Sequence, residues 1–423
     1  MSAIIALVVF CVVYYFIISE KINRTIIVIL GAFLLFFLGI FAHVEDAATR
    51  FIDFKTIFLL VGMMLLVSSI KKTRFFEWVA LGLLRASKGK VLRVFIYLNV
   101  AVALFSGFLD NVTTLLIFIP ITFAIVDIVK ASAAFFVVSE IISSNIGGTA
   151  TLIGDPPNIL IGSAANLPFI GFLQNTAPPA IVILLITLLV MALINRKEMQ
   201  KTFDPHTFDR SDPVPKSLLV KSSILLGITV FLFVFEHRLG IQNWITALGM
   251  GFFSVLVLDS HGLERHLKEV EWETIFFFVG LFLITGALEE TGVLQTVAHF
   301  LESRFGGSLS LFQPALFGFS FVMSGLVDNI PFTATMIPVI KHLPDLNPTM
   351  FTNLNPLWWS LSLGVCLGGN LTAIGASANV IGISLMRKHY HIKMGFVEFL
   401  KHSWIASLIS LVVGVGYILI RYS

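Results

Sequence analysis

Two stretches of the sequence place a carboxylate, an amide and hydroxyl groups within otherwise apolar surroundings. SGFLDNVTTLLIFIPIT covers residues 106–122, and SGLVDNIPFTATMIPVI covers residues 324–340. An ionisable side chain inside a membrane is costly and suggests function, because it can bind a proton or a cation. We therefore predict that Asp110 and Asp328 bind protons or cations, although Asp and Asn are also favoured helix N-caps. The predicted solute ligands beside them are Asn111, Thr113, Asn329 and Thr333.

A second pair of stretches has the composition of interrupted helices. SSNIGGTATLIGDPPN covers residues 143–158, and CLGGNLTAIGASAN covers residues 366–379. Glycine permits unusual backbone conformations and proline stops a helix, so each stretch predicts a break that exposes unpaired backbone groups. Paired breaks of this kind indicate a midplane binding site, whereas helix packing through small residues would explain the glycines alone. The predicted ligands here are Asn145, Gly147, Gly148, Thr149, Thr151, Asn158, Gly368, Gly369, Asn370, Thr372, Ser377 and Asn379.

Two further carboxylates lie in or beside the first break. Glu140 precedes Gly147 by seven residues on the same predicted helix, and Asp155 directly precedes Pro156. Both are candidate proton or cation groups. The repeat counterpart of Glu140 is Leu361, so Glu140 is not part of a symmetric core, and Asp155 could equally serve only to form a turn.

Other chemistries find no support in the motifs. The chain has no P-loop, GxGxxG, GxSxG or HExxH motif, and Cys11 and Cys366 are far apart with no CxxC. We therefore expect no enzyme activity, no cofactor, no metal site and no nucleic-acid partner. An intramembrane aspartyl protease is disfavoured, because residues 152–155 are Leu-Ile-Gly-Asp rather than GxGD. Transport would draw on an ion gradient or on a separate soluble ATPase.

The composition places these motifs in a membrane protein. Of the 423 residues, 57% are hydrophobic and 13% are charged, and the mean hydropathy is +0.93. A soluble domain is about 45–50% apolar and about 25% charged. Several nearly uncharged runs approach the length of about 20 residues that a membrane-spanning helix needs. The sequence therefore predicts an all-α polytopic membrane protein, and its first apolar run lacks the pattern of a cleaved signal peptide.

The motifs recur because the chain is duplicated. Asp328 follows Asp110 by 218 positions, and WETIFFFVGLFLI from residue 272 follows FKTIFLLVGMMLL from residue 54 by the same interval. The glycine-rich stretch recurs after 221 positions, at 147 and 368. We predict two homologous repeats, 1–194 and 217–423, joined by a polar cytoplasmic linker, 195–216.

The distribution of loop charges predicts how the repeats are oriented. Lys and Arg collect on the cytoplasmic side of a membrane, and the basic loops 19–24, 71–93, 195–216 and 387–401 alternate with loops poorer in base. Five crossings per repeat fit this alternation, with inverted repeats and both termini outside, although loop 259–273 is richer in acid than base. Each Asp-Asn stretch then becomes the tip of a re-entrant hairpin, the alternative being two full spans joined at the surface.

At these motifs the chain resembles the ion transporter superfamily of arsenite efflux permeases, sodium/proton antiporters, the melanosomal P protein and divalent-anion/sodium symporters. NIGGTATLIGDPPN, DNIPFTATMIPV and GGNLTAIGASANV carry the resemblance, above all to the P protein and bacterial arsenical pumps. It implies ten crossings, two hairpins, a moving subdomain on a scaffold, and a homodimer. Where the dicarboxylate symporters have serine at the hairpin tips, this chain has Asp110 and Asp328, which disfavour a dianion.

The sequence thus predicts a secondary transporter of the plasma (inner) membrane that exports arsenite or antimonite in exchange for protons. Arsenite at neutral pH is an uncharged trihydroxide that amide and hydroxyl groups can hydrogen-bond. The alternatives are a sodium/proton antiporter and a sodium-coupled carrier of dicarboxylates or other organic anions.

Overall fold

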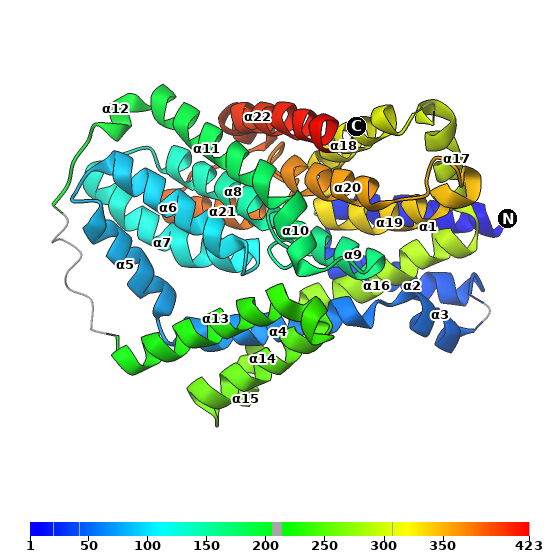
Figure 1. The fold of residues 1–423 in the computed structure, drawn as a ribbon, viewed down its shortest axis with the longest axis horizontal. Coiled ribbons are helices and arrows are strands. Elements are labelled where there is room, and N and C mark those ends of the chain that lie inside the picture. The colour runs from blue at the N-terminus through cyan, green and yellow to red at the C-terminus, as the bar shows by residue number, and fades with distance from the viewer. Residues whose placement is uncertain (20, 42, 205–213, 307, 423) are drawn as a thin grey trace.

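The computed structural model describes residues 1–19, 21–41, 43–204, 214–306 and 308–422, and its regular elements there are helices (Figure 1). The first part of the chain contains α1 (Ser2–Ser19), α2 (Arg24–Phe37), α3 (Val44–Phe51), α4 (Phe54–Lys72), α5 (Phe75–Ala86), α6 (Val91–Ser106), α7 (Asn111–Val129), α8 (Ala133–Thr149), α9 (Pro156–Ala165), α10 (Phe169–Asn175), α11 (Ala177–Ile194) and α12 (Arg196–Met199). The second part contains α13 (Lys216–Leu239), α14 (Asn243–Asp259), α15 (Leu263–Glu269), α16 (Trp272–Glu290), α17 (Val293–Phe305), α18 (Leu309–Val327), α19 (Asn329–Leu346), α20 (Asn355–Gly368), α21 (Ser377–Tyr390) and α22 (Phe396–Tyr422).

The order of helices in the first half recurs in the second. α4 and α16 begin 218 positions apart, at Phe54 and Trp272, and α7 and α19 keep the same interval. Likewise α1 to α9 correspond in order to α13 to α21, and α11 corresponds to α22. The relative orientation of the two repeats remains a prediction, and residues 205–213 of the predicted linker lie outside the described residues.

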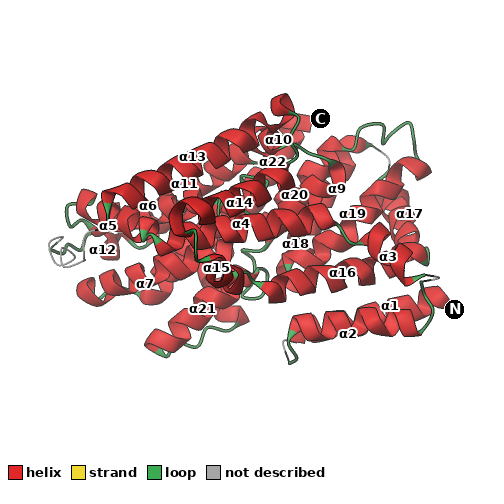
Figure 2. Ribbon diagram, turned by 90° about the horizontal axis from the view of Figure 1, so that it is seen from below, coloured by secondary structure: helices red, strands yellow, loops and turns green. Residues whose placement is uncertain are grey.

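The lengths of the helices fit a chain that crosses a membrane several times. Among the described residues, eight helices are long and apolar enough to do so, namely α1, α4, α7, α11, α13, α16, α18 and α22. Three shorter apolar helices, α2, α6 and α14, accompany them. Figure 2 shows α1, α2 and α16 running side by side, and these helices are in contact.

The arms of the two Asp-Asn hairpins approach the length of full membrane spans. α6 and α7 contain 16 and 19 residues, and α18 and α19 contain 19 and 18. A 19-residue helix rises about 28 Å, close to the thickness of about 30 Å of a bilayer core. Arm length therefore does not separate a re-entrant hairpin from two full spans, and the depth of the tips remains a prediction.

Helices from the two halves pack against each other: α4 packs on α14, and α2 packs on α16. At the first of these crossings the backbones touch. A Cβ atom on Gly251 would overlap the backbone of Gly62, and one on Gly62 would overlap the backbone at Ala247 and Leu248. Both positions require glycine because no side chain fits between the helices.

We expect Gly251→Ala to lower thermal stability markedly, because the α4–α14 crossing must open to make room for the methyl group. Gly249→Ala is the matched control: it lies on the same helix, and a Cβ there meets nothing within 4 Å. Thermal unfolding of the purified protein in detergent checks this. An equal melting temperature for both variants would contradict a backbone contact at this crossing.

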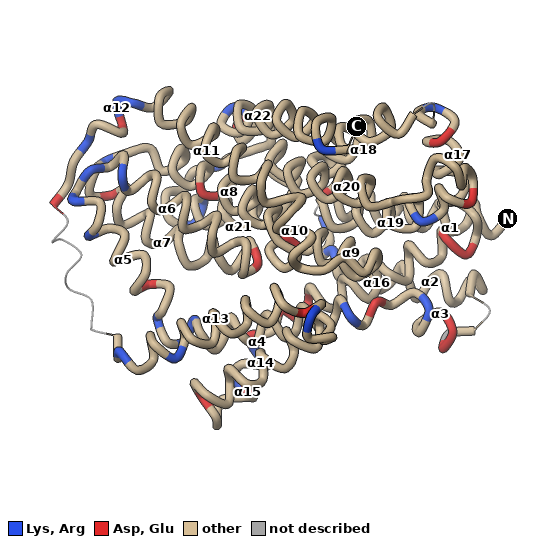
Figure 3. The backbone as a smooth tube through the Cα atoms, viewed as in Figure 1, with Lys and Arg blue, Asp and Glu red and all other residues tan. Residues whose placement is uncertain are grey.

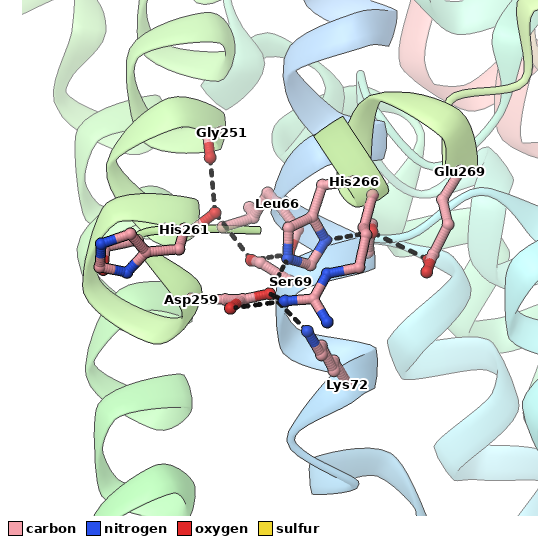
Figure 4. Close-up of polar contacts among 12 residues, drawn as sticks. Leu66, Ser69, Lys72, Gly251, Asp259, His261, His266 and Glu269 are labelled. Carbon is pink, nitrogen blue, oxygen red and sulfur yellow. Dashed lines mark hydrogen bonds and ion pairs between the residues drawn. The ribbon is translucent and has the colours of Figure 1, made fainter. Parts of the chain in front are cut away.

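A polar cluster fastens the short helix α15 to the same pair of helices (Figure 4). Asp259 forms an ion pair with Lys72 of α4. Its Oδ2 also lies 3.1 Å from His266 Nε2. The other ring nitrogen of His266, Nδ1, lies 2.7 Å from Ser68 Oγ, which donates to Glu269 at 2.9 Å. The cluster thereby fixes the segment between α15 and α16, which leads into the site described below.

Charged side chains are scarce in the middle of the bundle. Figure 3 shows most Lys, Arg, Asp and Glu residues at helix ends and in connecting segments. Two of the buried carboxylates, Asp155 and Asp328, directly precede α9 and α19, close to the starts of α7 and α21, and this junction is the candidate site.

Candidate solute and coupling site

Three aspartates stand at the starts of helices that meet at the centre of the molecule. Asp110 caps α7 by accepting a hydrogen bond from Thr113 N at 2.8 Å, and Asp328 caps α19 by accepting one from Ile330 N at 3.2 Å. Asp155 stands at the same position before α9, but its side chain makes no capping bond. Helix capping therefore accounts in part for Asp110 and Asp328, and it does not account for Asp155.

The break between α8 and α9 is held together by side chains within it. The amide nitrogen of Asn158 donates to Thr151 O at 2.8 Å and to Thr149 O at 3.2 Å, so it satisfies carbonyls that the interruption leaves unpaired. The hydroxyl of Thr151 donates to Gly107 O and accepts from Gly154 N at 3.1 Å. The first hairpin tip is thus bonded to the first break.

The break between α20 and α21 has the same construction. The amide nitrogen of Asn379 donates to Gly369 O and Thr372 O, each at 2.7 Å. The hydroxyl of Thr372 donates to Gly325 O at the second hairpin tip. In both halves, an asparagine closes the break and a threonine bonds it to the neighbouring tip.

The two breaks are also bonded to each other. Asn145 Nδ2 donates to Asn379 Oδ1 and to Asn370 Oδ1, each at 2.9 Å. On the other side, Asn158 Oδ1 accepts from Ser362 Oγ at 2.6 Å and from Cys366 Sγ at 3.3 Å. These side chains are fully buried. Because a buried polar group is stable only when it is hydrogen-bonded, the network fixes the two halves against each other.

The amides of the two tips are used differently. The Asn111 side chain is satisfied when its nitrogen donates to Gly154 O at 3.2 Å and to Ser144 O at 3.1 Å. Asn329 Nδ2 instead crosses to the other half and lies 3.3 and 3.4 Å from the two carboxylate oxygens of Asp155. Asp155 is 2% exposed, and the Asn329 amide is one hydrogen-bond donor within reach of its oxygens.

Two adjoining cavities open at this junction. The smaller, of about 60 Å³, is lined by Asp110, Asp155, Glu271 and Arg24, with amides from both tips. The larger, of about 690 Å³, reaches Asp328. The residues that line both cavities are Arg24, Val112, Glu271, Thr274 and Ser377. A solute moving from the larger cavity to the smaller one passes this shared ring.

The structure brings some of the predicted ligands to the cavities and leaves others behind them. Those that line the smaller cavity are Asp110, Asn111, Asp155, Asn329 and Ser377. Those in the bonded network behind it are Asn145, Asn158, Asn370, Asn379, Thr151 and Thr372, with Gly147, Gly148, Gly368 and Gly369 in the same breaks.

Four predicted site residues are engaged elsewhere. The hydroxyls of Thr149 and Thr333 donate to carbonyls of their own helices, at 2.7 and 2.6 Å. Thr113 contributes its backbone N–H to the Asp110 cap. Glu140 lies in the middle of α8, 1% exposed, and accepts a hydrogen bond from Thr122 of α7. Their proposed roles in binding and coupling remain predictions.

Two cavity residues, Arg24 and Glu271, were missed by the sequence reasoning. Arg24 lies in a basic segment that we assigned to a loop, where nothing indicates that its guanidinium reaches residues more than 300 positions away. Glu271 did leave a signal: it directly precedes the duplicated block from Trp272, and its repeat counterpart is another carboxylate, Asp53. A comparison of the positions flanking the block would have found it.

Glu271 is the titratable group at the mouth of the smaller cavity. Burial raises the pKa of its carboxyl to about 7, and the Asp110 carboxylate adds to the rise. A hydrogen bond from Thr274 and the charge of Arg24 oppose it. Because a raised pKa retains the proton to higher pH, Glu271 is neutral well below pH 7 and charged well above it.

We therefore expect solute entry through the larger cavity to slow as pH rises through about 7. A charged Glu271 adds negative charge beside Arg24 and weakens the attraction of the guanidinium for solute oxygens. Glu271→Gln should flatten this step, as measured by initial flux rates at equal pH on both sides of the membrane. Glu264→Gln, an exposed change on α15, should leave the step in place. A step unchanged in Glu271→Gln would assign it to another group.

A third cavity, of about 400 Å³, lies at the repeat-related position. It is lined by Lys55, Thr56 and Gln242, the counterparts of Glu273, Thr274 and Arg24. It shares no lining residue with the smaller central cavity, whereas the larger cavity shares five. The smaller cavity therefore adjoins one of the two repeat-related cavities, of about 690 and 400 Å³, which we call the two mouths of the site.

Comparison with known proteins agrees with this architecture. An uncharacterized transporter of Mycobacterium tuberculosis is 37% identical over 99% of both chains. The human P protein is 31% identical over 97% of this chain and 59% of its own length. In the fold, a crystal structure of the Alcanivorax borkumensis YdaH transporter has a TM-score of 0.61 over 89% of this chain and 87% of its own, at 14% identity.

The family is shown by a match over most of the chain. The sequence model of the CitMHS family, described as citrate transporter, matches residues 14–364. With its duplicated helices, its buried carboxylates and its bonded helix breaks, the chain is a multi-pass membrane transporter that belongs to the CitMHS citrate transporter family.

Proposed function

We propose that this secondary transporter exports a small uncharged hydroxo-solute, arsenite or antimonite, in exchange for protons. The observation that carries the proposal is the charge of the smaller cavity, where Asp110, Asp155 and Glu271 face one guanidinium, that of Arg24. Excess carboxylate favours uptake of protons and disfavours a free multivalent anion. A neutral trihydroxide can hydrogen-bond to these groups without adding charge.

The cavity is also small. Its volume of about 60 Å³ is less than a tenth of the 690 Å³ of the larger cavity. A compact solute suits this space, and a citrate-sized one requires the larger cavity or a rearrangement of the tips.

The second candidate is a citrate-type carboxylate that enters together with a cation. It is favoured by the family's description as citrate transporter and by Arg24 at the wall of the cavity of about 690 Å³. Arginine is well suited to bidentate recognition of carboxylates, and a bound cation would offset the nearby aspartates.

Within either candidate, Asp155 is the group that we assign to proton binding, because it is buried and caps no helix. Asp110 and Asp328, at the two hairpin tips, also bind protons or cations, and Glu140 is a further proton site on α8. The two repeat-related mouths would open in turn as one set of helices moves against the other, which is alternating access.

The remaining expectations about the assembly are part of the same proposal. They are five inverted crossings per repeat, both termini outside the plasma (inner) membrane, a homodimer, and a soluble ATPase that docks on the basic cytoplasmic loops. The proposed orientation rests on the basic segments 71–93 and 387–401 and on the linker, because Lys and Arg collect on the cytoplasmic side of a membrane.

Flux through the purified, reconstituted protein tests the function. Arsenite, citrate with Mg²⁺, citrate without Mg²⁺, and sodium are each offered under an imposed pH gradient, with empty vesicles as the control. Arsenite flux driven by the gradient and independent of sodium supports the proposal. Cation-dependent citrate flux selects the second candidate, and sodium exchange for protons without either solute replaces both with a cation antiporter.

A further inference from the structure

Arg24 lies outside the repeated sequence motifs. It is the first residue of α2, and its Nη1 donates to Ser377 Oγ at 2.8 Å and pairs with Asp328 Oδ2 at 3.4 Å. Its guanidinium carbon lies 5.1 Å from the centre of the Phe277 ring on α16. One side chain thus joins the α2–α16 pair to the second hairpin tip and to the start of α21.

The guanidinium of Arg24 lies where the two cavities adjoin, a position that we call the threshold. Arg24 lines both the cavity of about 690 Å³ and the cavity of about 60 Å³, and it is the one basic residue among the described residues that line either. Its side chain is 31% exposed, so it remains reachable from the larger cavity, whereas the Asp328 side chain is 12% exposed. A solute that leaves the larger cavity for the smaller one passes Arg24.

The repeat shows that this arrangement is specific to one mouth. The counterpart of Arg24 is Gln242, whose side-chain oxygen accepts a hydrogen bond from Trp244 Nε1 at 2.7 Å. The tips differ too: Asp328 has φ of 90°, a region that non-glycine residues rarely adopt, whereas its counterpart Asp110 has φ of −66°. The strained tip is the one that Arg24 contacts, and such strain marks sites where the surroundings fix the backbone.

We propose that Arg24 is a specificity-determining residue of the transport path. Its guanidinium favours solutes that present oxygen acceptors and retards simple cations, and it leaves Asp328 to bind the solute during entry. A guanidinium is positively charged at all relevant pH values, so its charge repels Na⁺. Its five N–H donors favour solutes with oxygen acceptors. This inference rests on the proposed function in that the solute is an oxygen-bearing molecule.

Cysteine labelling tests the threshold without any assumption about the solute. Val112→Cys places a thiol in the ring that the two cavities share, in the reconstituted full chain carrying Cys11→Ser. Its rates of reaction with an anionic and a cationic methanethiosulfonate of similar size give a ratio. Removing a unit charge near the thiol should lower the anionic-to-cationic ratio at least about tenfold in Arg24→Gln, the change that Coulomb's law gives at a separation of about 6 Å even at the dielectric of water.

Matched variants separate charge from packing. Arg24→Lys should retain the ratio, and Arg265→Gln should also retain it, because Arg265 is exposed on α15 and pairs with Asp259. Should Arg24→Gln not fold, Arg24→Met keeps a chain over Phe277 and removes the charge alone. A ratio unchanged in a folded neutral variant would overturn the inference.

Flux measurements distinguish the failure of this inference from that of the proposed function. In Arg24→Gln we expect the rate for the oxygen-bearing solute to fall and competition by Na⁺ to increase. If the wild-type protein moves neither arsenite nor citrate, the proposed function fails while a tenfold change in the labelling ratio still supports the threshold. If the wild-type protein moves the solute and neither ratio nor competition changes in Arg24→Gln, the inference alone fails.

Discussion

Replacement of Asp155 by asparagine is expected to abolish proton-driven transport and to leave the protein folded. The carboxylate is 2% exposed, makes no helix cap, and meets Asn329 of the opposite repeat at 3.3 and 3.4 Å. Asparagine has nearly the same shape and retains a hydrogen-bonding partner there, but it cannot take up a proton. The rate under a pH gradient should fall on the order of 100-fold, the scale on which loss of a proton-transfer group acts.

The measurement compares initial flux in proteoliposomes with and without the pH gradient, and thermal unfolding monitors the fold. Asp46→Asn is the matched control, because Asp46 is exposed on α3, away from both cavities. Asp110→Asn is a second comparison: an asparagine can still cap α7, so any loss of flux there reports on charge rather than on capping. Full proton-driven flux in Asp155→Asn would exclude Asp155 from coupling.

Much of the architecture was accessible from the sequence because it is written in local patterns. Apolar runs predict the spans, and Gly and Pro predict the breaks, since each acts on the backbone where it stands. The duplication adds a second reading of every motif, and the helices do recur at the interval of 218 positions found in the sequence. The inverted orientation depends on loop charge, a weaker signal, and remains a prediction.

The contents of the site were less accessible, because the site depends on contacts between distant segments. The motif residues Asp155 and Asn329 each look like local capping or turn residues, and only the fold brings them together across 174 positions. Arg24 lies in a polar segment without repeat support, and its contact with Ser377 spans 353 positions. Conversely, Thr149 and Thr333 have suitable side chains in the motifs, but their hydroxyls bond to their own helices.

We expect Asn379→Ala to disrupt the site as a whole rather than one ligand. The Asn379 amide satisfies Gly369 O and Thr372 O at 2.7 Å each, and its oxygen accepts from Asn145 at 2.9 Å. Alanine leaves these groups without that partner in a fully buried position. Each unsatisfied buried group costs about 1–3 kcal/mol, so both stability and transport should fall well beyond the effect of losing one contact.

Thermal unfolding and flux of the same preparations check this prediction. The matched control is Asn353→Ala: Asn353 is exposed, and its side chain accepts a hydrogen bond from Asn355 N at 3.0 Å, at the start of α20. Its loss should cost about 1 kcal/mol, the usual effect of a cap, and leave transport intact. Because Asn158 closes the other break in the same way, Asn158→Ala should resemble Asn379→Ala. A protein that melts and transports like wild type without Asn379 would show that the break holds its shape without this side chain, and the bonded core of the site would then have to lie elsewhere.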